Sequence, residues 1–231
     1  EKLRYGENPH QESAIYSKKE TLNIKKIYGK PLSFNNYNDI FAALIISKSL
    51  PNNTGTVIVK HANPCGVSIC KNSLRSYQLA LACDPISAFG GIVSCNFKIN
   101  KMLAIELNKN FLEVIIANGF DTNALKILKN KKNLRIIDAT DFIMQDNMKL
   151  NTINEYFLTQ SEDLKKFNIK DFKIVSKKKP TKHQLKSLIF AFNVCRYVKS
   201  NAIVLVNHET TVGIGSGQPS RLDSCQIAID K

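Results

Sequence analysis

The stretch VIVKHANPCGVSIC, residues 57–70, carries a short apolar run into a turn that contains proline and glycine. The β-branched residues before Lys60 predict a buried strand. Lys60 and His61 then lie at the C-terminal end of that strand, where α/β sheets usually bind their ligands. With Cys65 close by, the stretch leaves three kinds of site open: a metal site, a thiol nucleophile and a proton-transfer site.

The segments around this stretch alternate between helical and strand patterns. A helix with apolar residues at helical spacing is expected to begin near Asn38-Asp39, which can cap it. Alternation of helices and strands is typical of an α/β fold with a largely parallel sheet. Further helices are expected over residues 73–82, 102–112, 123–129 and 181–200, and strands over residues 56–60, 91–95, 113–117, 134–138, 202–206 and 211–215.

The same patterns divide the chain into three parts. Residues 1–138 form a first α/β unit. Residues 139–180 are more polar and lose the alternation, which indicates a connecting or partly helical insertion. The capping box TKHQ at residues 181–184 opens the first helix of a second unit, residues 181–231.

The charge and hydropathy of the chain exclude several classes of protein. The net charge of +14 comes from 28 lysines and only 5 arginines, and the arginines are not interleaved with aromatic residues, so we expect no specific nucleic-acid binding. No apolar run approaches the ~18 residues of a membrane helix, and the first residues do not resemble a signal peptide. The composition predicts a soluble, cytoplasmic protein that does not bind membranes.

Metal and thiol chemistry find little support in the spacing of the cysteines and histidines. A nucleoside-deaminase zinc site needs H-x-E or C-x-E followed by P-C-x-x-C, whereas Cys70 follows Cys65 at a longer spacing and His208 is adjacent to Glu209. We therefore expect no metal site. A nucleophilic Cys65 would need its pKa lowered by nearby positive charge, and a small buried cysteine is the more common case.

The remaining interpretation uses Lys60 and His61 directly. An imidazole can take a proton from an amine near neutral pH, and an ammonium can offset negative charge on a carbonyl oxygen under attack. The glycines at positions 213, 215 and 217 could hold a phosphate, but they lack both the Walker lysine and the Rossmann spacing. On their own, these patterns predict an α/β enzyme that binds a small anion.

Five longer motifs, in this order, resemble the transformylase portion of the bifunctional AICAR transformylase/IMP cyclohydrolase family. They span nearly the whole chain: RYGENPHQ (4–11), KHANPCG (60–66), DPISAFGGIVS (84–94), RYVKSNAIV (196–204) and GIGSGQPSR (213–221).

The resemblance implies formyl transfer from the cosubstrate 10-formyltetrahydrofolate to the 5-amino group of AICAR, giving FAICAR in purine biosynthesis. It implies two cytidine-deaminase-like α/β subdomains, the second incomplete here, and a homodimer with active sites across the interface. The family's cyclohydrolase domain precedes the first motif, so this chain is expected to be an internal piece of a bifunctional protein. The alternative is a truncated or decayed module that binds AICAR or a dimer partner without catalysis.

The resemblance also implies roles for individual residues. His61 would transfer the proton, Lys60 would be its electrostatic partner, and no metal would be needed. The substrate-binding residues would be Arg4 and Tyr5 for the phosphate, Asn201 for the carboxamide, Arg221 and Gln218 facing the substrate, and Asn96 where some members carry an acidic contact.

Overall fold

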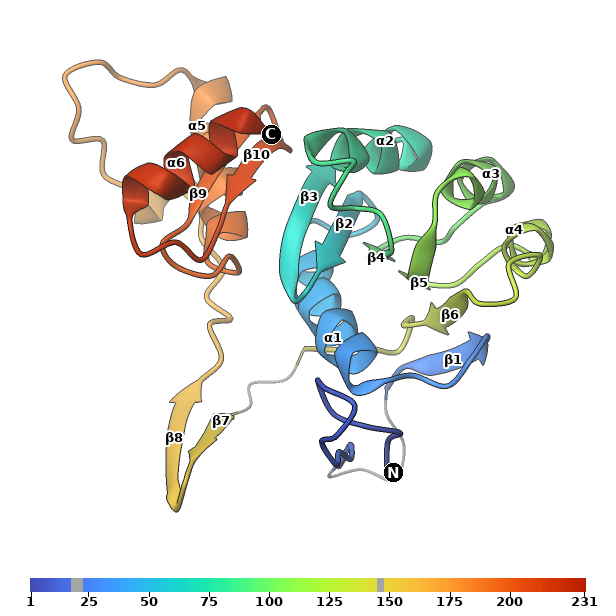
Figure 1. The fold of residues 1–231 in the computed structure, drawn as a ribbon. Helices are drawn as coiled ribbons and strands as arrows, with labels where there is room; N and C mark the ends of the chain where they lie inside the picture. The colour runs from blue at the N-terminus through green and yellow to red at the C-terminus, as the bar shows by residue number, and fades with distance from the viewer. Residues whose placement is uncertain (18–22, 145–147) are drawn as a thin grey trace.

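The computed structural model describes residues 1–17, 23–144 and 148–231, and in them an eight-stranded mixed sheet is the centre of the fold (Figure 1). The strand order is β1-β6-β5-β4-β2-β3-β10-β9. These strands are β1 (Lys25–Tyr28), β2 (Gly55–Lys60), β3 (Asn63–Ile69), β4 (Gly91–Cys95), β5 (Leu112–Ala117), β6 (Arg135–Asp138), β9 (Ile203–Asn207) and β10 (Thr210–Gly215). The helices are α1 (Phe34–Ser49), α2 (Ser73–Cys83), α3 (Lys101–Lys109), α4 (Thr122–Leu128), α5 (Lys182–Cys195) and α6 (Arg221–Asp230).

The α/β class is confirmed, but the expectation of a largely parallel sheet was wrong. Among the pairings of the described strands, only β4–β5 and β5–β6 are parallel, and the others are antiparallel. The cause lies at the KHANPCG motif, where β2 and β3 are joined by two residues, a connection that only antiparallel strands allow. Strand β3 was not predicted, because Pro64 and Gly66 lie within it and were interpreted as turn residues.

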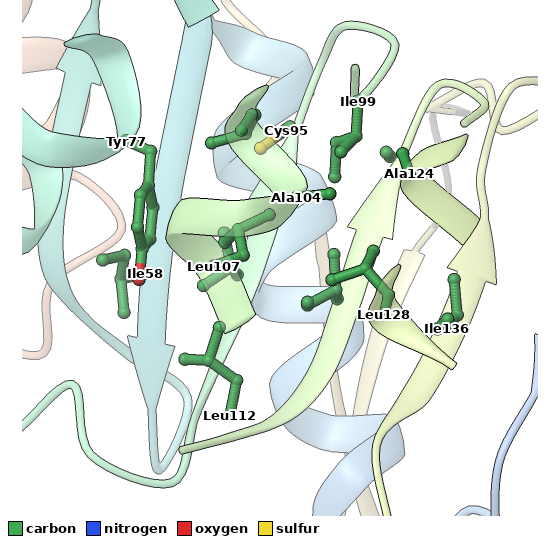
Figure 2. Close-up of a cluster of buried hydrophobic side chains, with 14 of the residues drawn as sticks. Ile58, Tyr77, Cys95, Ile99, Ala104, Leu107, Leu112, Ala124, Leu128 and Ile136 are labelled. Carbon is green, nitrogen blue, oxygen red and sulfur yellow. The ribbon is translucent and has the colours of Figure 1, made fainter. Parts of the chain in front are cut away.

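Two apolar layers cover the two faces of the sheet. On one face, Tyr77 of α2, Leu107 of α3 and Leu128 of α4 pack with Ile58 and Ile136 of the sheet (Figure 2). On the other face, α1 and α5 pack against alternate residues of the same strands, because side chains along a strand point to opposite faces. The residues buried on that second face include Ile40, Leu44, Val57, Val59, Ile92, Val114, Ile116, Phe190 and Val194.

Helix α1 begins earlier than the sequence indicated. Ser33 is the N-cap, and it exchanges hydrogen bonds with Asn36 in a capping box, with distances of 3.1 Å from Asn36 N to Ser33 Oγ and 3.2 Å from Ser33 N to Asn36 Oδ1. Asp39, expected near the cap, therefore lies inside the helix. Its carboxylate does not cap the helix and instead contacts the turn after β2.

Residues 139–180 connect the two predicted units without an α-helix in the described part of the segment. They contain the hairpin of β7 (Met148–Ile153) and β8 (Tyr156–Ser161) and one short 3₁₀ helix, η1 (Ile169–Asp171). The hairpin projects away from the main sheet (Figure 1). The domain division stays a prediction, although β9 and β10 of the second predicted unit do extend the sheet beyond β3.

Candidate active site

The KHANPCG motif forms a tight hairpin turn at one edge of the sheet. Lys60 ends β2, Asn63 begins β3, and these two residues pair across the turn. His61 and Ala62 both have positive φ values, 51° and 58°. The side chain of His61 is exposed at the tip of the turn, where it is accessible to a substrate.

Lys60 is held by the loop that precedes β4. Its Nζ donates to the carbonyl oxygens of Phe89, at 3.2 Å, and Gly90, at 3.0 Å. Gly90 has a φ of 67°, and a Cβ at this position would lie 3.0 Å from Lys60 Nζ, so a glycine allows the close approach. Neutral carbonyls position the ammonium and leave its positive charge available for a ligand.

Three of the predicted substrate-binding residues lie together at the loop between β10 and α6, which Asn201 contacts from the segment just before β9. Asn201 Nδ2 donates to the carbonyl oxygens of Gln218, at 3.0 Å, and Pro219, at 2.8 Å. Arg221 Nη2 donates to Asn201 Oδ1 at 3.4 Å, and Ser224 Oγ donates to the Asn201 carbonyl at 2.9 Å. The motifs RYVKSNAIV and GIGSGQPSR thus form one cluster.

This Asn201 cluster lies beside the Lys60-His61 turn. Strands β3 and β10 are antiparallel, with Thr210 opposite Ser68, so the end of β10 and the start of β3 meet at the same edge of the sheet. A hydrogen bond from Lys199 N to Asn63 Oδ1, at 3.4 Å, joins the two groups. The structure therefore brings Lys60 and His61 together with the Asn201 cluster.

Arg4 and Tyr5 approach from the side of α1. Their segment is joined to the first turn of α1 by a hydrogen bond from Asn35 Nδ2 to the Glu7 carbonyl, at 3.3 Å, and Figure 1 shows it beside the start of that helix. Arg4 is exposed, with its guanidinium 5.6 Å from the centre of the Tyr5 ring. A planar guanidinium in this position is suited to a phosphate.

Asn96 is not part of this group, which corrects the sequence-based expectation. It is 3% exposed, and its Oδ1 accepts from the backbone N–H groups of Thr54 and Gly55, at 3.0 and 2.8 Å. Its Nδ2 donates to the carbonyls of Ser47 and Pro51, at 2.9 and 3.0 Å. Because β4 runs antiparallel to β2, the residue after β4 lies at the opposite edge of the sheet from the residue after β2.

Two carboxylates that the sequence did not single out lie at the same edge of the sheet as Lys60 and His61. Asp39 Oδ1 accepts a hydrogen bond of 2.7 Å from Ala62 N. Glu113 is the second residue of β5, at the same edge of the sheet, and its carboxylate accepts from Asn36 Nδ2 at 3.0 Å. The sequence did not indicate either residue as part of a site. Asp39 was assigned to the expected helix cap, and Glu113 lies in an apolar strand.

The thiol and phosphate-loop alternatives are not supported by the local geometry. Burial raises the pKa of Cys65 to about 12, so its thiol is uncharged near neutral pH and is a poor nucleophile. A Cβ at Gly213 or Gly215 would lie 1.8 Å from the backbone carbonyl oxygen of Ala228 or Ser224. These two glycines therefore let α6 pack against β10.

Within the described ranges, His, Cys, Asp and Glu form no group of three or more placed to hold a metal ion. In the same ranges, no helix is both long and apolar enough to cross a membrane.

Comparison with known proteins identifies the family. A solved structure of dCMP deaminase from the cyanophage S-TIM5 aligns over 43% of this chain and 93% of its own, at 11% identity, but with a TM-score of only 0.33. The bifunctional purine biosynthesis protein PurH of Leptospira biflexa is 43% identical over 100% of this chain and 45% of its own length. The PurH proteins of Acetivibrio thermocellus and Aquifex aeolicus are each 41% identical. The chain spans about half the length of these curated relatives. The sequence profile described as AICARFT/IMPCHase bienzyme matches residues 1–231, and the chain belongs to this family.

Proposed function

We propose that this chain is the part of a bifunctional purine-biosynthesis enzyme that transfers a formyl group from 10-formyltetrahydrofolate to the 5-amino group of AICAR. The observation that carries the proposal is the meeting of the Lys60-His61 turn and the Asn201 cluster at one edge of the sheet. Both come from motifs that a member of this family would use for substrate binding and for proton transfer.

His61 acts as the general base in the proposed reaction. The AICAR amine is a poor nucleophile because its lone pair is drawn through the ring toward the carboxamide. As the amine nitrogen attacks the formyl carbon, the exposed His61 imidazole takes the amine proton, and the Lys60 ammonium stabilises the negative oxygen of the tetrahedral intermediate. The bond between the formyl carbon and N10 then breaks, and the nitrogen of tetrahydrofolate takes up a proton. The proposal assigns no step to a metal ion.

The remaining residues bind the nucleotide. Arg4, with Tyr5 beside it, holds the phosphate. The amide nitrogen of Asn201 donates to two backbone carbonyls. Its Oδ1 accepts from Arg221 at 3.4 Å and has a second lone pair that can accept from the carboxamide NH₂ of AICAR. Arg221 and Gln218 complete this side of the site, and Asn96 is left out because all its side-chain hydrogen bonds are internal.

The proposed enzyme is a cytoplasmic homodimer with its sites across the subunit interface, and IMP cyclohydrolase activity belongs to a part of the protein outside this chain. A non-catalytic AICAR-binding or dimerisation module is the second candidate.

The test is 10-formyltetrahydrofolate-dependent formylation of AICAR by the full-length protein that carries this chain, with the His61→Ala variant in parallel. Loss of a general base should lower kcat by about 10²- to 10⁴-fold while AICAR binding is retained. His183→Ala is the matched control, because His183 is an exposed histidine on α5. Unchanged activity in His61→Ala would remove this residue from the mechanism, and an inactive wild-type protein that binds AICAR would favour the second candidate.

A further inference from the structure

The turn that presents His61 has a backbone conformation that its residues do not favour. A two-residue hairpin turn with positive φ at both positions is a type I′ turn, which is normally built from Asn-Gly, Asp-Gly or Gly-Gly. Here the two residues are His61 and Ala62, with φ values of 51° and 58°. For a residue with a Cβ, the left-handed region is disfavoured by the close approach of the Cβ to the following carbonyl oxygen, so contacts outside the turn must stabilise this conformation.

Asp39 supplies such a contact from another element. Its Oδ1 accepts the backbone N–H of Ala62 at 2.7 Å. Burial raises the pKa of the Asp39 carboxyl above its ordinary value, and hydrogen bonds from the backbone of Ala62 and His61, with the charges of His61 and Lys60, oppose that rise. The carboxylate is therefore half-buried and directed at the backbone of the turn.

The helix that carries Asp39 is fixed in the core. The next residue, Ile40, is fully buried, and Leu44 one turn later is 1% exposed. The other side of the turn is held within the motif itself, because Asn63 Nδ2 donates to the His61 carbonyl at 3.0 Å. The His61 side chain is exposed, so its direction depends on the backbone that these contacts hold.

We propose that Asp39 is a positioning residue: its carboxylate holds the His61-Ala62 turn in the left-handed conformation and thereby directs the His61 imidazole toward the substrate. This inference rests on the proposed function of His61 as the general base. It assigns to Asp39 no contact with substrate and no proton in the reaction.

The experiment is a double-mutant cycle in the full-length protein, with kcat and KM for AICAR formylation measured in wild type, Asp39→Ala, His61→Ala and the double variant. Misplacement of the base should lower kcat by about 10- to 100-fold in Asp39→Ala with little change in KM. If Asp39 acts through His61, the Asp39→Ala change should lower kcat much less in the His61→Ala background. Equal losses in both backgrounds would mean an independent structural role and would overturn the proposal.

Two further variants test the backbone mechanism. Ala62→Gly should restore much of the activity of Asp39→Ala, because glycine adopts the left-handed region without a steric cost. Asp39→Asn keeps an oxygen acceptor for the Ala62 N–H and should retain most of the activity. The proposal is overturned if Ala62→Gly gives no recovery in a folded Asp39→Ala protein, or if Asp39→Asn is as impaired as Asp39→Ala.

Matched controls distinguish a loss of His61 positioning from a loss of protein stability and from an error in the proposed function. Asn38→Ala removes an exposed polar side chain from the adjacent position of α1 and should leave kcat unchanged. If Asp39→Ala does not fold, Ala62→Val strains the same turn with Asp39 present and should lower kcat in the same way; full activity in Ala62→Val would then overturn the proposal. Full activity in His61→Ala would instead show that the assignment of the base is wrong, whereas an inactive His61→Ala beside a fully active, folded Asp39→Ala would refute the role of Asp39 alone.

Discussion

The Gly66→Ala substitution tests how strand β3 carries the KHANPCG motif. Gly66 faces helix α2, and a Cβ at this position would lie 1.9 Å from the carbonyl oxygen and 2.8 Å from the carbonyl carbon of Ala80. Both atoms belong to the helix backbone, so no change of side-chain rotamer can remove the clash. A single methyl group should therefore force β3 and α2 apart.

The magnitude follows from this geometry. A carbon and a carbonyl oxygen without a covalent bond approach to about 3.3 Å, so the strand and the helix must separate by about 1.4 Å. Overpacking a core costs about 1–3 kcal/mol and occasionally more. We expect the upper end, about 3 kcal/mol, because the separation also loosens the packing of Tyr77 and Ala80, which are 0% and 1% exposed. For a domain of this size, that loss lowers the Tm by roughly 6–12 °C.

The assay is thermal and urea unfolding of wild type, Gly66→Ala and the control Cys70→Ala, followed by circular dichroism. Cys70 is half-exposed just beyond the end of β3, so its replacement should shift the Tm by at most a degree or two. A Gly66→Ala protein with a wild-type Tm would refute the reasoning, because it would mean that β3 and α2 are not in contact at this position. AICAR formylation should fall together with stability, since β3 begins directly after the His61-Ala62 turn.

Two further outcomes follow from individual groups. Burial raises the pKa values of Cys65 and Cys95 to about 12, so both thiols should react with iodoacetamide far more slowly than the half-exposed Cys70, as measured by peptide mass spectrometry; labelling of Cys65 first would contradict its burial. Asp84 lies 2.7 Å from Lys231, and although burial opposes the effect, hydrogen bonds from Lys231 and a serine lower its pKa. A lowered pKa stabilises the fold above the ordinary pKa of an aspartate and is lost as the pH falls through the lowered value. Asp84→Asn should therefore cost about 2 kcal/mol at pH 7 and progressively less as the pH falls below the ordinary pKa of an aspartate, as measured by urea unfolding; a cost that does not change with pH would contradict this.

Most elements of the fold could be predicted from the sequence, because their patterns are local. The apolar runs of β2, β4 and β5 and the spacing of apolar residues in α2 and α3 set the type of each element, and the structure confirms them. Strand β3 could not be predicted in this way. Its pairing with β2 and the close approach of Gly66 to α2 are tertiary contacts, which override the turn tendency of proline and glycine.

The sequence could indicate single positions at strand ends, but it could not indicate the tertiary contacts that bring them together, such as the pairing of β3 with β10 that places the Asn201 cluster beside the Lys60-His61 turn. Lys60 and His61 follow a strand, and that position alone indicated a ligand site. Asp39 reaches the same turn from the middle of α1, and this contact exists only because Ser33 and Asn36 start the helix one and a half turns earlier than expected. An error of a few residues in a helix boundary was enough to hide a contact with the proposed base.

The placement of Asn96 shows why strand direction matters more than sequence distance for such a site. Asn96 and His61 both follow the end of a central strand, and in a parallel sheet both would lie at the same edge. Because β2 and β4 are antiparallel, Asn96 instead lies at the opposite edge, and its side chain joins the end of α1 to the start of β2 through five backbone groups. By the same reasoning, residues at the start of β4 and β5, such as Glu113, lie on the His61 side. A polar residue that follows a strand thus becomes a site candidate only once the direction of that strand is known.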